Sequence, residues 1–198
     1  GKDGDKESSD TTETLYQFAK DNNYLVKNVV QLNKWGTPID FTNPDAYAWY
    51  QGLIRQYTDM GIEGFKLDYG EDIVVGVLGL DIQETQFFDG STERTMHAKY
   101  QTLYHRIYAE TLPEDGGFLL CRRGVWGDQA NVSVIWPGDL DADFSTHRQP
   151  MTDGEGKQYN AVGGLPASVI YGLSLGVSGF PFFGADTGGY RHSPPKKE

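Results

Sequence analysis

The segment Gly61-Ile-Glu-Gly-Phe-Lys-Leu-Asp68-Tyr-Gly-Glu71-Asp72 is the most informative part of the sequence, because an apolar run interrupted by glycine opens abruptly into carboxylates. The strands of a (β/α)8 barrel end in this way when they carry functional acids, since the sites of that fold gather at the carboxyl ends of its strands. A second stretch, Val132-Ser-Val-Ile-Trp136-Pro-Gly-Asp139, has the same form. Asp139 follows Asp68 by 71 residues, which leaves room for about two β-α units of roughly 30 residues each. We therefore expect both acids on nearby strand ends.

Hydrophobic periodicity places helices and strands in alternation along the rest of the chain. The expected helices span residues 14–22, 44–60, 95–110 and 167–175, and the expected strands span residues 64–67, 118–122, 132–136 and 179–183. Asn43 and Pro44 are typical of a helix start, because asparagine caps the first turn and proline suits the first helical position. Alternating strands and helices indicate parallel βαβ units, so the expected fold class is α/β.

Composition narrows the class of protein. The chain has 198 residues, of which 38% are apolar and 13% aromatic, enough for the core of one domain. A formal net charge of −11 argues against binding to nucleic acid or to an anionic membrane, because either surface needs clustered Lys and Arg. Sugar binding fits better, since sugars stack on aromatic rings and hydrogen-bond to carboxylates. No stretch approaches the ~18 apolar residues of a membrane span.

Cysteine use leaves the compartment open. The single cysteine, Cys121, excludes a disulfide within this chain. It follows Phe118-Leu-Leu in an apolar run, which predicts a small buried hydrophobic side chain rather than a reactive thiol.

Several separated motifs of this sequence resemble, in the same order, the catalytic barrel of glycoside hydrolase family 31, which includes α-glucosidases and α-xylosidases. The resemblance extends from about Tyr24 to Tyr190. The matching motifs are Ile39-Asp-Phe-Thr-Asn-Pro-Asp-Ala, Gly-Phe-Lys66-Leu-Asp68-Tyr-Gly-Glu71, Phe88-Asp-Gly-Ser with Met96-His97, Arg123, Trp136-Pro-Gly-Asp139 and Ser178-Gly-Phe-Pro-Phe-Phe-Gly-Ala-Asp186-Thr-Gly-Gly-Tyr190.

The resemblance implies a (β/α)8 TIM barrel of which this chain covers only about four β-α units. Four strands leave two unpaired sheet edges and cannot close a barrel. We therefore interpret residues 14–198 as part of a catalytic domain, whose remaining segments are expected partners. Residues 1–13 are polar and charged without an apolar period, which predicts a mobile end or a loop.

The resemblance also implies a retaining α-glycoside hydrolase that acts on α-glucosides or related α-linked sugars by double displacement. Such enzymes need one carboxylate as nucleophile and a second as acid and then base, about 5–5.5 Å apart. The resemblance gives Asp68 the first role and Asp139 the second. It implies no metal or organic cofactor, an α-linked oligosaccharide or glycoside as substrate, and four substrate-binding residues: Lys66, Arg123, Trp136 and Asp186.

Some choices stay open within this interpretation. Arg122 could take the role of Arg123, but Arg123 precedes Asp139 by 16 residues, as the family's arginine does. The family usually has serine after this arginine, where this chain has Gly124. Glucose, xylose, galactose and sulfoquinovose all remain candidates for the cleaved position, and transglycosylation remains an alternative to hydrolysis.

Two other functions compete with the glycosidase. Gly172-Leu-Ser174-Leu-Gly176 fits the nucleophile elbow of serine hydrolases, and Asp186 and His192 follow in the order of that triad. The elbow should join a strand to a helix, whereas Ser174 falls inside an expected helix, which weighs against a serine esterase. The other alternative is a non-catalytic carbohydrate-binding or interaction fragment of the same fold.

Overall fold

The computed structural model describes residues 14–28, 37–70 and 85–192. The polar end predicted for residues 1–13 and the acids Glu71 and Asp72 lie outside these described residues. Contacts divide the chain into two compact units, Gly1–Glu63 with Tyr69–Gly117 and Gly64–Asp68 with Phe118–Glu198. We call them unit 1 and unit 2 and describe each on its own.

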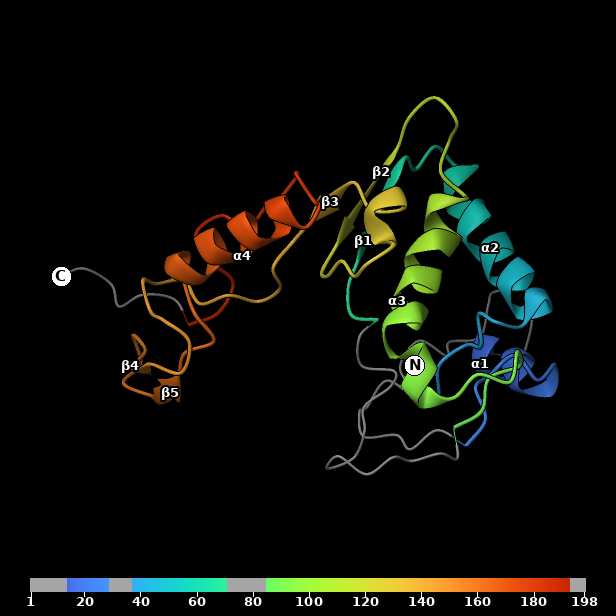
Figure 1. Cartoon of the computed structure of the whole chain (residues 1–198), viewed down its shortest axis with the longest axis horizontal. Coiled ribbons are helices and arrows are strands. Elements are labelled where there is room, and N and C mark those ends of the chain that lie inside the picture. Colours follow the sequence, from blue (N-terminus) through green and yellow to red (C-terminus); the bar gives the residue numbers. More distant parts are fainter. Residues whose placement is uncertain (1–13, 29–36, 71–84, 193–198) are drawn as a thin grey trace. The chain divides into compact units, whose positions relative to one another are not determined.

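The described part of unit 1 contains three helices: α1 (Leu15–Asp21), α2 (Pro44–Thr58) and α3 (Glu93–Ala109). Helix α2 begins where the sequence predicts, because the Asn43 side chain accepts a hydrogen bond of 3.0 Å from the backbone N–H of Asp45. Helix α3 begins two residues earlier than predicted, where the backbone N–H of Thr92 donates to the Thr95 hydroxyl at 3.2 Å. Helices α2 and α3 pack against each other (Figure 1).

The core of unit 1 is aromatic. Phe41 is buried, and its ring centroid lies 5.3 Å from the centroids of both Tyr50 and Tyr100. The Tyr100 hydroxyl donates to the carbonyl oxygen of Ile39 at 2.9 Å, which satisfies the polar end of a buried ring. Burial raises the pKa of this hydroxyl. Ile107 of α3 completes this core with no exposed surface.

A parallel sheet of β1 (Gly64–Leu67), β2 (Phe118–Cys121) and β3 (Val134–Ile135) organises unit 2, in the order β1-β2-β3. Leu67 pairs with Cys121, and Cys121 pairs with Ile135. All three side chains are buried, which confirms that Cys121 is a core residue. Burial, with a smaller contribution from the Asp128 carboxylate, raises the pKa of the Cys121 thiol to about 12.

The fourth expected strand, residues 179–183, does not form. Phe183 makes only an isolated parallel bridge with Ile135. Gly179 has a φ of +86°, which lies outside the extended region, and Pro181 has no N–H to donate to a ladder. The sheet therefore has three strands among the described residues, and the bridge places Phe183 beside β3.

Three short elements of unit 2 were not predicted. Residues Pro150–Thr152 (β4) and Gln158–Asn160 (β5) form an antiparallel hairpin, and Asp128–Ala130 forms a 3-10 turn, η3. Each has three residues, too few for a periodic pattern to emerge. In the hairpin turn, Asp153 Oδ1 accepts the backbone N–H groups of Glu155 and Lys157 at 3.0 and 2.8 Å.

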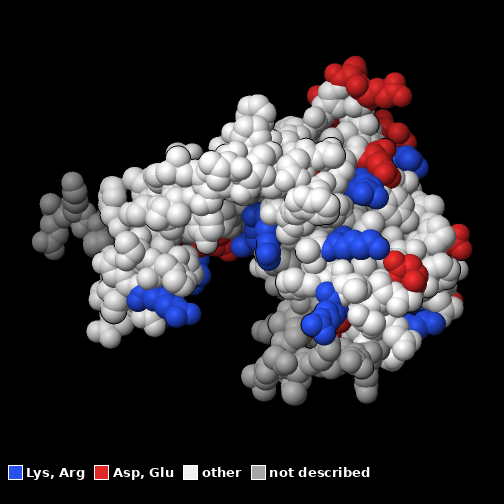
Figure 2. All heavy atoms as spheres, viewed as in Figure 1, with Lys and Arg blue, Asp and Glu red and all other residues white. Residues whose placement is uncertain are grey.

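Helix α4 (Leu165–Val177) extends the predicted helix by two residues at each end. Within the described part of the chain none of its residues is buried. Ile170, Leu173 and Val177 are 64%, 69% and 90% exposed, and the face of α4 turned to the viewer in Figure 2 carries neither acidic nor basic atoms. The described helices include none that is long and apolar enough to cross a membrane.

Candidate active site

The carboxyl ends of the three parallel strands bring the predicted site residues to one edge of the sheet. Asp68 follows β1, Arg122 follows β2 and Trp136 follows β3. The strand ladder continues past the ends of these strands: the Arg122 N–H donates to the Leu67 carbonyl at 3.0 Å, and the Trp136 N–H donates to the Cys121 carbonyl at 2.8 Å. The backbone therefore fixes the level at which these side chains leave the sheet.

One guanidinium joins the two predicted catalytic carboxylates. Arg122 Nε donates to Asp68 Oδ1, and Arg122 Nη2 donates to Asp139 Oδ1 at 3.2 Å. The Arg122 side chain is 17% exposed, whereas the Asp68 and Asp139 side chains are 41% and 30% exposed. Gly138 makes room for the cation, since a Cβ there would lie 2.7 Å from Arg122 Nη1. The carboxylates thus stand open to solvent around a largely covered cation.

Trp136 connects the remaining predicted residues to this cluster. Its ring is buried, and its Nε1–H donates to Asp186 Oδ2 at 2.7 Å. Lys66 Nζ lies 3.7 Å from the Trp136 ring centroid, and Arg122 Cζ lies 4.6 Å from it, within the range of cation–π attraction. Lys66, Asp68, Trp136, Asp139 and Asp186 therefore belong to one continuous set of contacts through Arg122.

The two adjacent arginines differ in their surroundings. The structure brings Arg122 to both carboxylates, whereas Arg123 is exposed. Gly138 is the signal that favours Arg122, because it leaves space for a bulky side chain beside Asp139.

The serine esterase arrangement is not assembled. Ser174 lies inside α4 rather than at a turn between strand and helix. His192 Nδ1 pairs with Asp141 at 2.6 Å, while Asp186 accepts its bond from Trp136. Asp186 and His192, the acid and the base of this triad, therefore each bind another residue.

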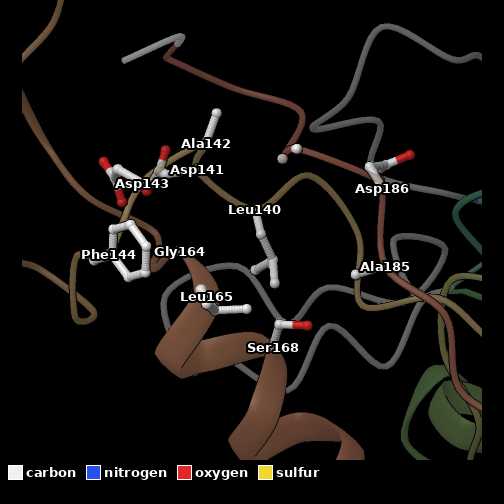
Figure 3. A pocket seen from close by; sticks show the side chains of 12 residues that line it. Leu140, Asp141, Ala142, Asp143, Phe144, Gly164, Leu165, Ser168, Ala185 and Asp186 are labelled. Atoms are coloured by element: carbon white, nitrogen blue, oxygen red, sulfur yellow. The ribbon is translucent and has the colours of Figure 1, made fainter. Parts of the chain in front are cut away.

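A pocket of about 260 Å³ lies beside the cluster (Figure 3). Asp141 and Asp143 contribute to one wall and Asp186 to another, with Leu140 between them and Ser168 of α4 below. Leu140 follows Asp139 directly, so the pocket adjoins the segment that carries the second carboxylate. The described residues contain no cluster of three or more His, Cys, Asp or Glu side chains that could hold a metal ion.

Parallel strands that present acids at their carboxyl ends are the arrangement found at the sites of (β/α)8 enzymes. The chain belongs to glycosyl hydrolases family 31, a family of retaining glycosidases: the model of that family's TIM-barrel domain matches residues 5–198.

Relatives within this family cover nearly the whole chain. It is 29% identical over 192 residues to an alpha-xylosidase of Emericella nidulans, a match that spans 91% of this chain and 21% of the relative. It is 28% identical over 188 residues to a sulfoquinovosidase of Escherichia coli, which spans 89% of this chain and 24% of the relative. The chain therefore spans about a fifth to a quarter of the length of these relatives.

A solved structure shares the fold. A GH31 family sulfoquinovosidase from E. rectale, in complex with an aza-sugar inhibitor, superposes with a TM-score of 0.71 at 23% identity, over 89% of this chain and 25% of that one. At this identity the likeness shows the fold alone, and it agrees with the three parallel strands described above.

Proposed function

We propose that this chain carries the nucleophile and the acid/base of a retaining α-glycosidase that acts on α-glucosides or related α-linked sugars. One observation carries the proposal: Asp68 and Asp139, which lie far apart in the sequence, share the guanidinium of Arg122. A single cation between two partly exposed carboxylates places both acids around one small volume, as a reaction at a single glycosidic bond requires.

The roles follow from the resemblance of each motif to the family. Asp68 is the nucleophile: its carboxylate forms a bond to the anomeric carbon as the bond to the leaving oxygen breaks. Asp139 gives that oxygen a proton in the first step and takes a proton from water in the second, which releases the sugar and restores both acids. Arg122 replaces Arg123 in the proposal as the residue that holds the carboxylates in place.

The surrounding residues form the proposed sugar site. Lys66 offers donors to hydroxyl groups and lies over the buried Trp136 ring, and Asp186 holds that ring in place through its indole N–H. The sugar at the cleaved position stays undecided, since the relatives include a xylosidase and sulfoquinovosidases. Because the chain spans a quarter or less of these relatives, we propose that further segments of an intact enzyme complete the site.

The decisive experiment compares two variants in the intact enzyme that contains this chain. Asp68→Ala should abolish turnover of every glycoside, because no substrate bypasses the nucleophile. Asp139→Ala should retain turnover of aryl glycosides whose leaving group needs no proton, and azide should accelerate it by replacing base-assisted water. Equal losses on activated and unactivated glycosides would remove the assignment of roles.

A trapping experiment tests the nucleophile directly. A fluorosugar substrate that forms the glycosyl-enzyme but releases it slowly should label the peptide containing Asp68, and Asp68→Ala should abolish the label. A label on another carboxylate would overturn the assignment. Inactivation by a serine-directed phosphonate would favour the esterase, and sugar binding without any turnover would favour the non-catalytic fragment.

A further inference from the structure

Asp141, two residues after the proposed acid/base, is a buried carboxylate with every oxygen engaged. Its side chain is 0% exposed. Oδ2 accepts the backbone N–H groups of Val162 and Gly163 at 2.6 and 3.0 Å, and Oδ1 pairs with His192 Nδ1 at 2.6 Å. A buried carboxylate is costly unless it is paired and hydrogen-bonded in this way, so its partners determine where it lies.

The backbone around Asp141 is held from a second direction. Asp141 forms a parallel bridge with Arg191, the Arg191 N–H donates to the Leu140 carbonyl at 3.0 Å, and the Ala142 N–H donates to the Arg191 carbonyl at 2.7 Å. Gly189 permits this approach, because a Cβ there would lie 2.3 Å from the Ala142 Cα. The segment that follows Asp139 is thus fixed both by its backbone and by the Asp141 side chain.

Tyr159 contacts both His192 and Asp143. Tyr159 of β5 stacks on His192 with ring centroids 3.7 Å apart and an interplanar angle of 16°. The Tyr159 hydroxyl donates to Asp143 Oδ2 at 2.8 Å. The Asp141 carboxylate holds the edge of the His192 ring at Nδ1 and Tyr159 covers one face, which together fix the orientation of the imidazole.

We propose that Asp141, oriented by His192, is a positioning residue for Asp139 and sets the angle at which that acid meets the leaving oxygen. The inference rests on the proposed function and extends it. General acid catalysis needs the proton donor within about 2.6–3.2 Å of the oxygen, and a displacement of about 1 Å can cost roughly 10²-fold in rate. Only Leu140, whose carbonyl is already bound by Arg191, separates the anchored Asp141 from Asp139.

The test is Asp141→Asn in the intact enzyme, with kcat/KM measured for two substrates of the same sugar. On a disaccharide or alkyl glycoside, which needs the proton, kcat/KM should fall about 10²-fold. On an aryl glycoside with a strongly activated leaving group it should change less than about threefold, because bond cleavage there needs little acid assistance. An equal fall on both substrates would overturn the proposal, since general destabilisation predicts no such split.

Asp153→Asn is the matched control. Asp153 also accepts two backbone N–H groups through its carboxylate, but it does so in the hairpin turn, away from Asp139 in the sequence. This variant should leave kcat/KM for both substrates unchanged. If it reproduced the difference between the two substrates, the effect would be a general property of unit 2 and the proposal would fail.

A pair of His192 variants keeps the test decisive if Asp141→Asn does not fold. His192 has a φ of +51°, a conformation that asparagine tolerates, and an asparagine amide nitrogen can take the place of Nδ1. His192→Ala should show the substrate-dependent loss and His192→Asn should largely restore activity. Identical behaviour of the two variants would overturn the role of His192. Absence of turnover by the wild-type enzyme would instead refute the proposed function itself.

Discussion

Helix α3 of unit 1 and helix α4 of unit 2 differ in how much of their apolar surface is covered. Five residues of α3 are buried, whereas none of α4 is buried within the described part of the chain. Unit 1 stabilises its helices by aromatic packing around Phe41. In unit 2, hydrogen bonds and ion pairs hold the loops together, and Arg122 and Asp141 each bind more than one partner. Substitutions in unit 1 should therefore change stability, and those in unit 2 should change chemistry.

The largest expected effect concerns the uncovered surface of unit 2. Residues 1–198 expressed alone should show no detectable turnover of an aryl α-glycoside and should aggregate, because the apolar side chains of α4 are exposed. Amides of α4 should also exchange with solvent faster than those of α3. The checks are kcat/KM, light scattering and hydrogen exchange. An active, cooperatively melting monomer of 198 residues would contradict this prediction and the comparison on which it rests.

The next effect separates the two arginines of unit 2. In the intact enzyme, Arg122→Met should lower kcat/KM by about 10²- to 10³-fold, the usual cost of losing one preorganised charged donor from an active site. Arg123→Met should lower it by less than about tenfold. Circular dichroism of both variants should match the wild type. A larger loss of kcat/KM for Arg123→Met than for Arg122→Met would favour Arg123, the residue that the 16-residue spacing from Asp139 indicates.

The fold was predictable where local signals are strong. Asn43 and Pro44 determine the start of α2, and residues 64–67 form β1 with the predicted bounds. Residues 179–183 misled because their apolar composition suits a strand, while the backbone geometry of Gly179 and the missing N–H of Pro181 prevent a ladder. Hairpin β4–β5 was too short for periodicity, although Asp153 and the glycines after it mark its turn.

The candidate site was predictable as a set of residues and not as a set of contacts. Motif resemblance selected Asp68, Asp139 and Trp136, and the structure brings them to one edge of the sheet. The contacts of Arg122 needed geometry, because the sequence alone does not tell which of two adjacent arginines meets the carboxylates. The role of Asp141 was also invisible in the sequence, since its partners lie about 20 and 50 residues away.

A matched pair of alanine substitutions measures the difference between α3 and α4. Ile107→Ala should lower the free energy of unfolding by about 2–5 kcal/mol, because it leaves a cavity in the buried core of unit 1. Leu173→Ala in the same 198-residue chain should change it by less than about 0.5 kcal/mol, because the side chain is 69% exposed. Denaturant unfolding at protein concentrations too low for aggregation measures both. In the intact enzyme the Leu173→Ala cost should rise if other segments cover α4.

The smallest effect compares one carboxylate of each unit as the pH changes. Burial alone would raise the pKa of Asp143, but hydrogen bonds from Ser145 and Tyr159 and the nearby His192 hold that pKa below its usual value. Burial alone would also raise the pKa of Asp89. Hydrogen bonds from Ser91 and the nearby Lys99 ammonium outweigh this effect, so the pKa of Asp89 is lowered as well. A carboxyl group whose folded pKa is lowered stabilises the protein above its unfolded pKa of about 4, and this stabilisation disappears as the pH falls through the folded value.

Asp143→Asn and Asp89→Asn should therefore both lower the melting temperature of the intact enzyme at pH 7, and each difference from the wild type should shrink below about pH 4. The two should respond differently to salt. Asp89 pairs with Lys99 at 3.4 Å on an exposed surface, so 1 M NaCl should screen much of its contribution, whereas the hydrogen bonds of Asp143 to Ser145 and Tyr159 should persist. The difference in melting temperature between Asp143→Asn and the wild type could instead stay constant from pH 7 to pH 3. That result would show that the charge of the Asp143 carboxylate does not stabilise its contact with Tyr159.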